Sequence, residues 1–346
     1  YAQWGRFMQI GNVTLAGRMV LAPMAGVTDR AFRSLCLRHG AGLTFSEMVS
    51  AKGLEYNGVK TFALTDPAED EAVLAVQLFG SEPDCMARQA VRVAERLGDR
   101  LALIDVNMGC PVRKVVRRGE GSALMQTPKL ASDIIRSIVD AVDVPVTAKF
   151  RSGWTNEERN AVDFAKRLEQ AGVSLVSVHG RSARQMYRGN ADWDVIAQVK
   201  EAVAIPVAGS GDVFSHDDTC RMRERCGVDV VHVARGARGN PWIFTGHEPS
   251  HVERVAAMRE HFELYLHYAD PLKARDERPS TSDEAIPAPL DAPAPYLSPL
   301  RAQLAWYVHG LPSAAALRRA LSEARSIADF ERIFDEAGKL AEDDSR

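Results

Sequence analysis

The sequence has few cysteines, and their spacing excludes the common metal and disulfide frameworks. Its five cysteines include no CxxC pair and no zinc-like spacing, and an odd number cannot all pair with one another. No set of histidines, cysteines and carboxylates has metal-ligand spacing, and no Ser-His-Asp order with an elbow motif is present. We therefore expect reduced thiols and no metal, and neither a zinc enzyme nor a serine hydrolase.

Long hydrophobic runs and an excess of one charge are also missing. No apolar run approaches the roughly 20 residues that span a bilayer, and no basic-then-apolar leader is present, so we expect a cytoplasmic protein without a membrane partner. The net charge of −3 gives no general attraction to nucleic acid, so a polyanionic partner would need a local basic patch. Neither GxGxxG nor a Walker loop occurs, which argues against Rossmann and P-loop proteins.

What the chain does contain is a series of eight short apolar runs separated by helix-sized intervals. They are rich in Val, Leu and Ile at consecutive positions, as strands buried on both faces should be. Eight strand-helix units predict an α/β protein with a (β/α)8 TIM barrel. A doubly wound sheet is the alternative, but it ordinarily needs fewer repeats and a glycine-rich first turn. The runs begin at Met19, Gly42, Leu74, Leu101, Val144, Leu175, Ile205 and Val228. Helices are expected at 84–97, 129–142, 159–171 and 193–202.

After residue 244 the pattern becomes helical, which predicts a small second domain. We expect domains at 1–245 and 246–346, with helices at 251–268, 300–308, 313–325 and 327–340. A proline-rich segment at about 271–299 has few large apolar residues and predicts a mobile linker.

Polar and glycine residues gather where the predicted strands end. Barrel enzymes carry their chemistry at the C-terminal ends of the strands. The opposite ends show only turn residues, so we expect one functional face. The residues at the strand ends are Pro23, Met24, Gln77, Asn107, Cys110, Lys149, Arg151, His179, Arg181, Ser210, Gly211, Asp212, Ala234 and Arg235.

Two of these features suggest an anionic ligand. Lys149 lies inside an otherwise apolar strand, where an ammonium is costly without an anion such as a phosphate or the negative charge of a reduced flavin. The alternative is a strand-end lysine that reaches solvent. Segments 209–211 and 235–239 follow the last two strands, where barrels often hold a phosphate, although such glycines can also serve only as tight turns. Arg235 would add a charge, and His179 could bond a phosphate or ring.

Cys110 lies at the tip of a turn and is followed by four cations. A thiol there can give or take a proton beside a polyanion; the alternative is a structural cysteine next to a solvated basic surface. Tyr187 and Trp193 offer stacking surfaces for bases. The basic residues in these loops are Arg113, Lys114, Arg117, Arg118, Arg181, Arg184, Arg188, Arg235 and Arg238.

Eight segments occur in one order and match a known family: LAPMAGVTDRAFR, SEMVSAKGL, VQLFG, DVNMGCPVRKVVRRGEGSALM, VTAKFRSGW, VHGRSARQMYRGNADW, VAGSGDV and VARGARGNPWIF. On these segments, from about residue 20 to residue 244 and more loosely beyond, the chain resembles the tRNA-dihydrouridine synthases, and within them the bacterial B-type branch. The resemblance implies an FMN-containing barrel at 1–245 and a helical tRNA-binding domain at 246–346. It also implies that NADPH or NADH supplies the electrons for reducing particular uridines of tRNA, and we expect a monomer.

The resemblance also implies roles for single residues. A hydride from flavin N5 adds to C6 of uracil while the thiol of Cys110 gives a proton to C5, and Asn107 orients a flipped-out base. NADPH would react first and leave before RNA enters. Expected RNA contacts are Arg113, Lys114, Arg181 and Arg184. Expected FMN contacts are Pro23, Met24, Ala25, Gln77, Lys149, His179, Ser210, Gly211, Asp212, Ala234 and Arg235.

The chain departs from the family pattern at two places, and two other functions stay open. Glu120 puts a carboxylate where the family usually has a small residue, and the usual Arg-Lys-His run reads Arg301-Ala302-Gln303. These changes affect the expected grip on tRNA and the uridine chosen. The alternatives are an FMN barrel that reduces a small conjugated substrate and an RNA-binding regulatory protein without turnover.

Overall fold

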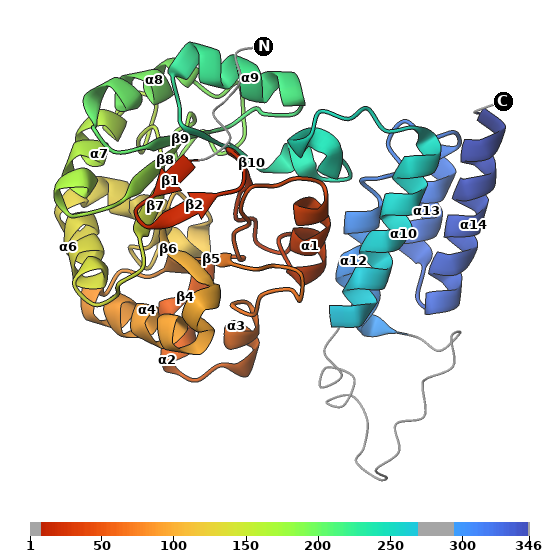
Figure 1. Ribbon diagram of the computed structural model, residues 1–346, viewed down its shortest axis with the longest axis horizontal. Helices are drawn as coiled ribbons and strands as arrows, with labels where there is room; N and C mark the ends of the chain where they lie inside the picture. Colours follow the sequence, from red (N-terminus) through yellow and green to blue (C-terminus); the bar gives the residue numbers. More distant parts are fainter. Residues whose placement is uncertain (1–7, 269–293, 345–346) are drawn as a thin grey trace, which may run out of the picture.

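The computed structural model describes residues 8–268 and 294–344, and eight of its strands form one parallel sheet surrounded by helices (Figure 1). The sheet order is β3-β10-β9-β8-β7-β6-β5-β4, so the first strand of the sheet pairs with the last. This order confirms the predicted barrel and excludes the doubly wound alternative. The strands are β3 (Met19–Leu21), β4 (Val49–Ser50), β5 (Leu74–Phe79), β6 (Leu101–Met108), β7 (Val146–Arg151), β8 (Leu175–His179), β9 (Val207–Ser210) and β10 (Val230–Val233).

The second predicted strand is wrong in its position. Residues 42–48 make only isolated bridges, from Thr44 to Leu21 and from Phe45 to Ala75, and β4 starts just after them. A Cβ at Gly42 would collide with the backbone of the segment before β3, so the chain passes too close there for a regular strand. The ring of strands still closes, because Leu21 N of β3 donates to Leu43 O at 2.9 Å and Ala75 N of β5 donates to Thr44 O at 3.1 Å.

A short antiparallel hairpin that the sequence pattern did not predict covers the N-terminal end of the barrel. Its strands are β1 (Met8–Ile10) and β2 (Val13–Leu15). Leu15 and its neighbours pack against barrel-lining residues such as Phe45 and Leu103. The barrel is therefore closed at the end opposite to the expected site.

Helices cover the outside of the sheet, and all four predicted barrel helices are confirmed to within three residues. Their apolar faces pack on the strands in one large core. Asp29 caps α1 by accepting from Phe32 N, and Ser215 and Asp218 form a capping box on α9. The helices are α1 (Arg30–Arg38), α2 (Ala51–Glu55), α3 (Val59–Ala63), α4 (Pro83–Leu97), α5 (Arg113–Val116), α6 (Pro128–Val139), α7 (Ala161–Gln170), α8 (Trp193–Ala202) and α9 (His216–Cys226). Short 3-10 turns are η1 (Gly98–Arg100), η2 (Gly121–Gln126), η3 (Arg235–Ala237), η4 (Pro241–Phe244) and η5 (Pro295–Leu297).

The remaining helices stand together at one side of the barrel, next to α1 (Figure 1). They share a separate core in which Phe262, Phe330 and Phe334 contact one another, and this core includes Ala31 and Leu35 of α1. The helix predicted at 300–308 ends earlier, at residue 304, while the other three match closely. Most of the proline-rich segment lies outside the described residues. The helices are α10 (His251–Tyr268), α12 (Ser298–Leu304), α13 (Ala314–Glu323) and α14 (Ile327–Asp344).

Candidate active site

A cavity of about 350 Å³ opens at the C-terminal ends of the barrel strands. Its volume is typical of a small-ligand site. Asn107 and Cys110 line it, and so do all eleven residues for which FMN contact is expected. The parallel barrel brings them together because the carboxyl ends of its strands meet at one end. The eleven are Pro23, Met24, Ala25, Gln77, Lys149, His179, Ser210, Gly211, Asp212, Ala234 and Arg235.

The turn that carries Cys110 is held from several sides. Asn107, at the end of β6, accepts hydrogen bonds on Oδ1 from the backbone N–H of Cys110 at 2.9 Å and of Gly109 at 3.2 Å. Arg151, at the end of β7, donates from Nε to the carbonyl of Gly109 at 2.7 Å. Gly121 has φ of +60°, and a Cβ there would come within 2.7 Å of the Cys110 carbonyl oxygen, so the following loop packs closely on the turn.

The thiol of Cys110 is in an environment that keeps it protonated. Burial raises its pKa above the ordinary value, while the backbone at Val112 and the charge of Arg151 oppose the shift. A protonated thiol is a proton donor rather than a nucleophile. The arrangement therefore suits acid catalysis at the pocket wall.

Lys149 presents an uncompensated cation to the same pocket. It lies opposite Asn107 in the β6–β7 register and makes no hydrogen bond or ion pair with any residue in the described ranges. Burial lowers its pKa to about 8; the charge of Arg151 adds to this shift and Asp105 opposes it. An ammonium so placed fits an electron-rich ligand, such as a flavin ring or a phosphate.

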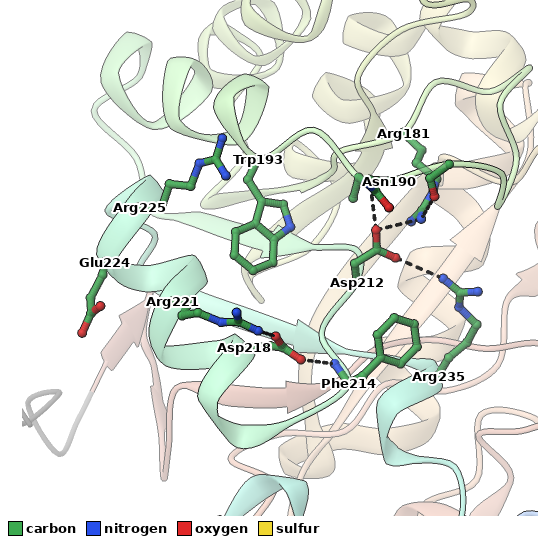
Figure 2. Close-up of a pocket in the computed structure, with 12 residues that line it drawn as sticks. Arg181, Asn190, Trp193, Asp212, Phe214, Asp218, Arg221, Glu224, Arg225 and Arg235 are labelled. Atoms are coloured by element: carbon green, nitrogen blue, oxygen red, sulfur yellow. Dashed lines mark hydrogen bonds and ion pairs between the residues drawn. The ribbon is translucent and has the colours of Figure 1, made fainter.

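The loop after β9 closely approaches the loop after β8 around Asp212, and Arg235 reaches Asp212 from the loop after β10. Figure 2 shows its carboxylate between Arg181 and Arg235, with N–O distances of 2.8 and 3.5 Å, and Ala191 N also donates to it at 2.7 Å. Gly211 has φ of +113°, and a Cβ there would meet Ala191 at 2.8 Å. The glycine is thus required for the tight approach, as in loops that cradle a phosphate.

A second, more open hollow of about 1100 Å³ lies beside the cavity and shares part of its wall (Figure 2). Asp212, Phe214 and Arg235 belong to both. On its far side Arg221 pairs with Asp218 on α9. Its charged groups are thus mostly neutralised within the protein.

Of the four residues expected to contact RNA, three are exposed at the surface and one is buried. Arg113 and Lys114 are exposed on α5, and Arg184 is exposed with its guanidinium 5.2 Å from the centre of the Trp154 ring. Arg181 is only 2% exposed, and it holds Asp212 and the carbonyl of Gly189, with 2.5 Å from Nη2 to that oxygen. In this structure Arg181 supports the loop after β9 rather than reaching the surface.

The sequence did not identify several residues at the mouth and floor of the cavity. Four large apolar side chains at the mouth are exposed by 43% to 56%, an arrangement typical of a surface that contacts a partner. The Tyr187 ring lies within cation–π distance of Arg235, at 4.9 Å. The one sequence signal for these apolar residues is that they lie in loops within or next to the segments that match the family. The four are Val112, Met186, Tyr187 and Phe214, of which the sequence indicated only Tyr187, as a stacking surface, and other unpredicted lining residues are Met48 and His232.

The described residues contain no cluster of three potential metal ligands. None of the helices in the described ranges has the length and apolarity needed to cross a membrane. The donor set of the cavity is amides, cations and glycine-lined loops, which matches a flavin phosphate and ring.

The fold and the cavity define a (β/α)8-barrel enzyme with a half-buried thiol in the cavity at the C-terminal ends of its strands. The family model described as dihydrouridine synthase (Dus) matches residues 20–341. A tRNA-dihydrouridine synthase B from Shewanella oneidensis is 44% identical over 68% of this chain and 73% of its own. A probable tRNA-dihydrouridine synthase from Rickettsia conorii is 37% identical over 97% of this chain and 99% of its own. The chain belongs to the dihydrouridine synthase family.

Solved structures agree on the fold. Histamine dehydrogenase from Rhizobium sp. 4-9 superposes with a TM-score of 0.55 at 15% identity, over 75% of this chain. The structure of a 2-naphthoyl-CoA reductase complex superposes with a TM-score of 0.55 at 14% identity, over 70% of this chain. This chain spans about half the length of both, since it covers 51% of each. At such low identity the similarity concerns the barrel alone.

Proposed function

We propose that this protein is an FMN-dependent reductase that converts uridine in tRNA to dihydrouridine, with NADPH or NADH as the electron source. The observation that carries the proposal is the position of the Cys110 thiol in the cavity wall of a member of the dihydrouridine synthase family, where burial raises its pKa. Saturating the C5=C6 bond needs a hydride at one carbon and a proton at the other. The thiol supplies the proton.

The residues of the cavity fit the proposed cofactor. Lys149 is suited to the flavin ring, and the glycine-lined loops at Gly211 and Arg235 are suited to its phosphate. FMN, when bound, would supply the hydride for C6 of the uracil. The protein's part is to hold the base with the amide of Asn107, to exclude water, and to deliver the Cys110 proton to C5.

The substrate must enter with its base unstacked, because the cavity lies below the mouth formed by Tyr187 and its apolar neighbours. Arg113, Lys114 and Arg184 are exposed in the α5 and β8–α8 loops and would contact the phosphates nearby. We also assign residues 246–346 to tRNA binding. We also propose a monomer as the active unit, and tRNA as substrate supports the cytoplasm as its location.

The proposed function is tested by purifying the protein, recording its flavin spectrum, and counting dihydrouridine by mass spectrometry in unmodified tRNA after NADPH is added. Cys110→Ala should lower the rate by about 10²- to 10⁴-fold, as expected for loss of a general acid. Cys220→Ala is the matched control, since this thiol on α9 does not line the cavity. Cys220→Ala should form dihydrouridine at the wild-type rate.

Three results would count against the proposal. A flavin-containing protein that binds tRNA without reducing it would favour the regulatory alternative. Turnover of small enones without RNA would favour the small-substrate reductase. Undiminished dihydrouridine in Cys110→Ala would remove Cys110 as the donor.

A further inference from the structure

A buried carboxylate lies directly beneath the cavity. Asp105 on β6 is 1% exposed and does not line the cavity wall. It faces Gln77 on β5 and Thr147 on β7 in the strand register, so the three side chains share the barrel interior. Gln77 Nε2 donates to Asp105 Oδ2 and Thr147 Oγ1 donates to Asp105 Oδ1, both at 2.6 Å. Each carboxylate oxygen therefore has a donor.

The hydrogen bonds continue from Asp105 to the turn that carries Cys110. Asn107 Nδ2 donates to Gln77 Oε1 at 2.8 Å, and Asn107 Oδ1 accepts from the backbone N–H of Cys110 at 2.9 Å. This chain of hydrogen bonds links the carboxylate of Asp105, the two side-chain amides and the turn that carries Cys110. Gln77 and Asn107 both line the cavity.

The chemistry at the two ends of this chain decides the direction of both amides. An ionised carboxylate can only accept, so Nε2 of Gln77 faces Asp105 and Oε1 faces Asn107. A backbone N–H can only donate, so Oδ1 of Asn107 faces the turn and Nδ2 faces Gln77. Either amide turned around would bring two donors or two acceptors together.

Each of the two side-chain amides keeps one N–H without a partner in this series, because an amide nitrogen carries two N–H groups and the hydrogen bonds described use one. With the ammonium of Lys149, the wall formed by β5, β6 and β7 thus offers donors, and both amide oxygens are already engaged. Such a wall is complementary to carbonyl oxygens, which both a flavin ring and a uracil carry. It discriminates against a ligand that presents N–H groups there.

We propose that Asp105 is a positioning residue that fixes the direction of the Gln77 amide and, through it, the Asn107 amide, so that the cavity offers N–H donors to the acceptor atoms of flavin and uracil. This inference rests on the proposed function. Burial raises the pKa of Asp105 to about 6, against the hydrogen bonds of Gln77 and Thr147 and the charge of Lys149. The carboxylate is therefore ionised and purely an acceptor at neutral pH.

The experiment compares three variants for FMN affinity, measured by flavin fluorescence on protein stripped of cofactor. Asp105→Leu removes the acceptor and should weaken FMN binding roughly tenfold, the effect of about one hydrogen bond. Asp105→Asn can direct its oxygen to Gln77 and its nitrogen to the Thr147 hydroxyl, so it should stay within about threefold of the wild type. Thr147→Val is the matched control. It removes a bond to the same carboxylate without touching Gln77, and it should lower thermal stability but not FMN affinity.

The three results separate positioning from other roles. Equal losses in Asp105→Asn and Asp105→Leu would overturn the inference, because charge near Lys149 would then be the cause. Equal losses in Thr147→Val and Asp105→Leu would reduce the role to general packing. If Asp105→Leu fails to fold, Asp105→Ala takes its place with the same expectation.

A second readout follows the chain to Asn107. With FMN saturating, Asp105→Leu should lower kcat for dihydrouridine formation with little change in KM for tRNA. Adding Asn107→Ala to Asp105→Leu should cost less in kcat than Asn107→Ala costs in the wild type, because part of both effects runs through the same hydrogen bonds. Full additivity would contradict a linked action. A wild-type protein that binds FMN but forms no dihydrouridine would defeat the proposed function while the affinity comparison still decides the role of Asp105.

Discussion

The side-chain oxygen of Asn107 accepts a hydrogen bond from the backbone N–H of Cys110, with 2.9 Å between oxygen and nitrogen. The residue proposed to orient the base therefore also holds the turn of the proposed acid. Asn107→Ala should lose both roles, with a rate at least about 10²-fold lower and a lower melting temperature, because the turn loses its cap. Asn107→Asp keeps the acceptor for the turn but sets its second oxygen against Gln77 Oε1, so it should lose the rate and also some stability. Thermal unfolding and single-turnover kinetics measure the two effects separately. Equal stability in Asn107→Ala and the wild type would contradict the first role.

The affinity for FMN should depend on pH through Lys149. Burial lowers the pKa of this lysine to about 8, from an ordinary value of 10.5. Below about pH 8 the side chain is charged and attracts an anionic ligand, and above it the empty site loses that charge. Affinity should therefore fall by up to about tenfold per pH unit as the pH rises above about 8. Titrations from pH 7 to 10 measure this fall. Lys149→Met should bind weakly with a flat profile, and Lys149→Arg should bind with the fall moved to higher pH. A flat profile in the wild type would remove Lys149 from the site.

Much of the fold could be predicted because buried parallel strands leave a simple pattern. Seven of the eight apolar runs became strands at the expected places, and the residues after them met at one end of the barrel. The exception is the run from Gly42, where a close backbone approach interrupts the strand. The hairpin at Met8–Leu15 was not predicted either, since strands of three residues are too short to show an alternation.

The sequence indicated many of the residues that line the cavity but not the contacts that they make. A loop arginine suggests a surface cation, yet Arg181 folds inward because Asp212, distant in sequence, binds it. Likewise Asp105 in a strand gives no hint that two neighbouring strands donate to it. Such pairings depend on register and packing, which a single sequence does not display.

Glu120 should destabilise the protein at neutral pH. It is 5% exposed, its Oε2 has no hydrogen-bond partner in the described structure, and burial raises its pKa above the ordinary 4.5. Folding therefore disfavours the ionised form of Glu120. The resulting loss of folding stability is present at pH values above the pKa of the folded state and disappears below about pH 4.5. Glu120→Gln should add about 1 kcal/mol to the free energy of unfolding at pH 7 and little at pH 4.

The exposed Glu82, which pairs with Lys52, supplies the control for this change. Glu82→Gln should give no gain at either pH. The sequence suggested that the Glu120 charge affects the grip on tRNA, but because this carboxylate is buried, Glu120→Gln should leave tRNA affinity within about twofold. A large gain in tRNA affinity would show instead that its charge reaches the RNA.

The ion pair between Arg33 and Glu71 should be the most sensitive single contact of the α1 region. Arg33 is 2% and Glu71 is 0% exposed, with 3.0 Å between Nε and Oε1, and Glu71 also accepts from Ala68 N and Thr44 Oγ1. Glu71→Ala leaves a buried guanidinium without its charge partner and should cost about 3–5 kcal/mol in urea unfolding at pH 7.

The double change Arg33→Met with Glu71→Leu should cost much less than the sum of the single changes, because it removes both buried charges at once. Lys129→Ala, which breaks an exposed pair with Asp133 on α6, should cost less than about 1 kcal/mol. Since Ala31 and Leu35 of α1 pack into the core of the C-terminal helices, Glu71→Ala should also loosen those helices. Hydrogen exchange in α10 and α12 would then rise together with exchange in α1. Unchanged protection in α10 would show that the helices hold their position independently of this pair.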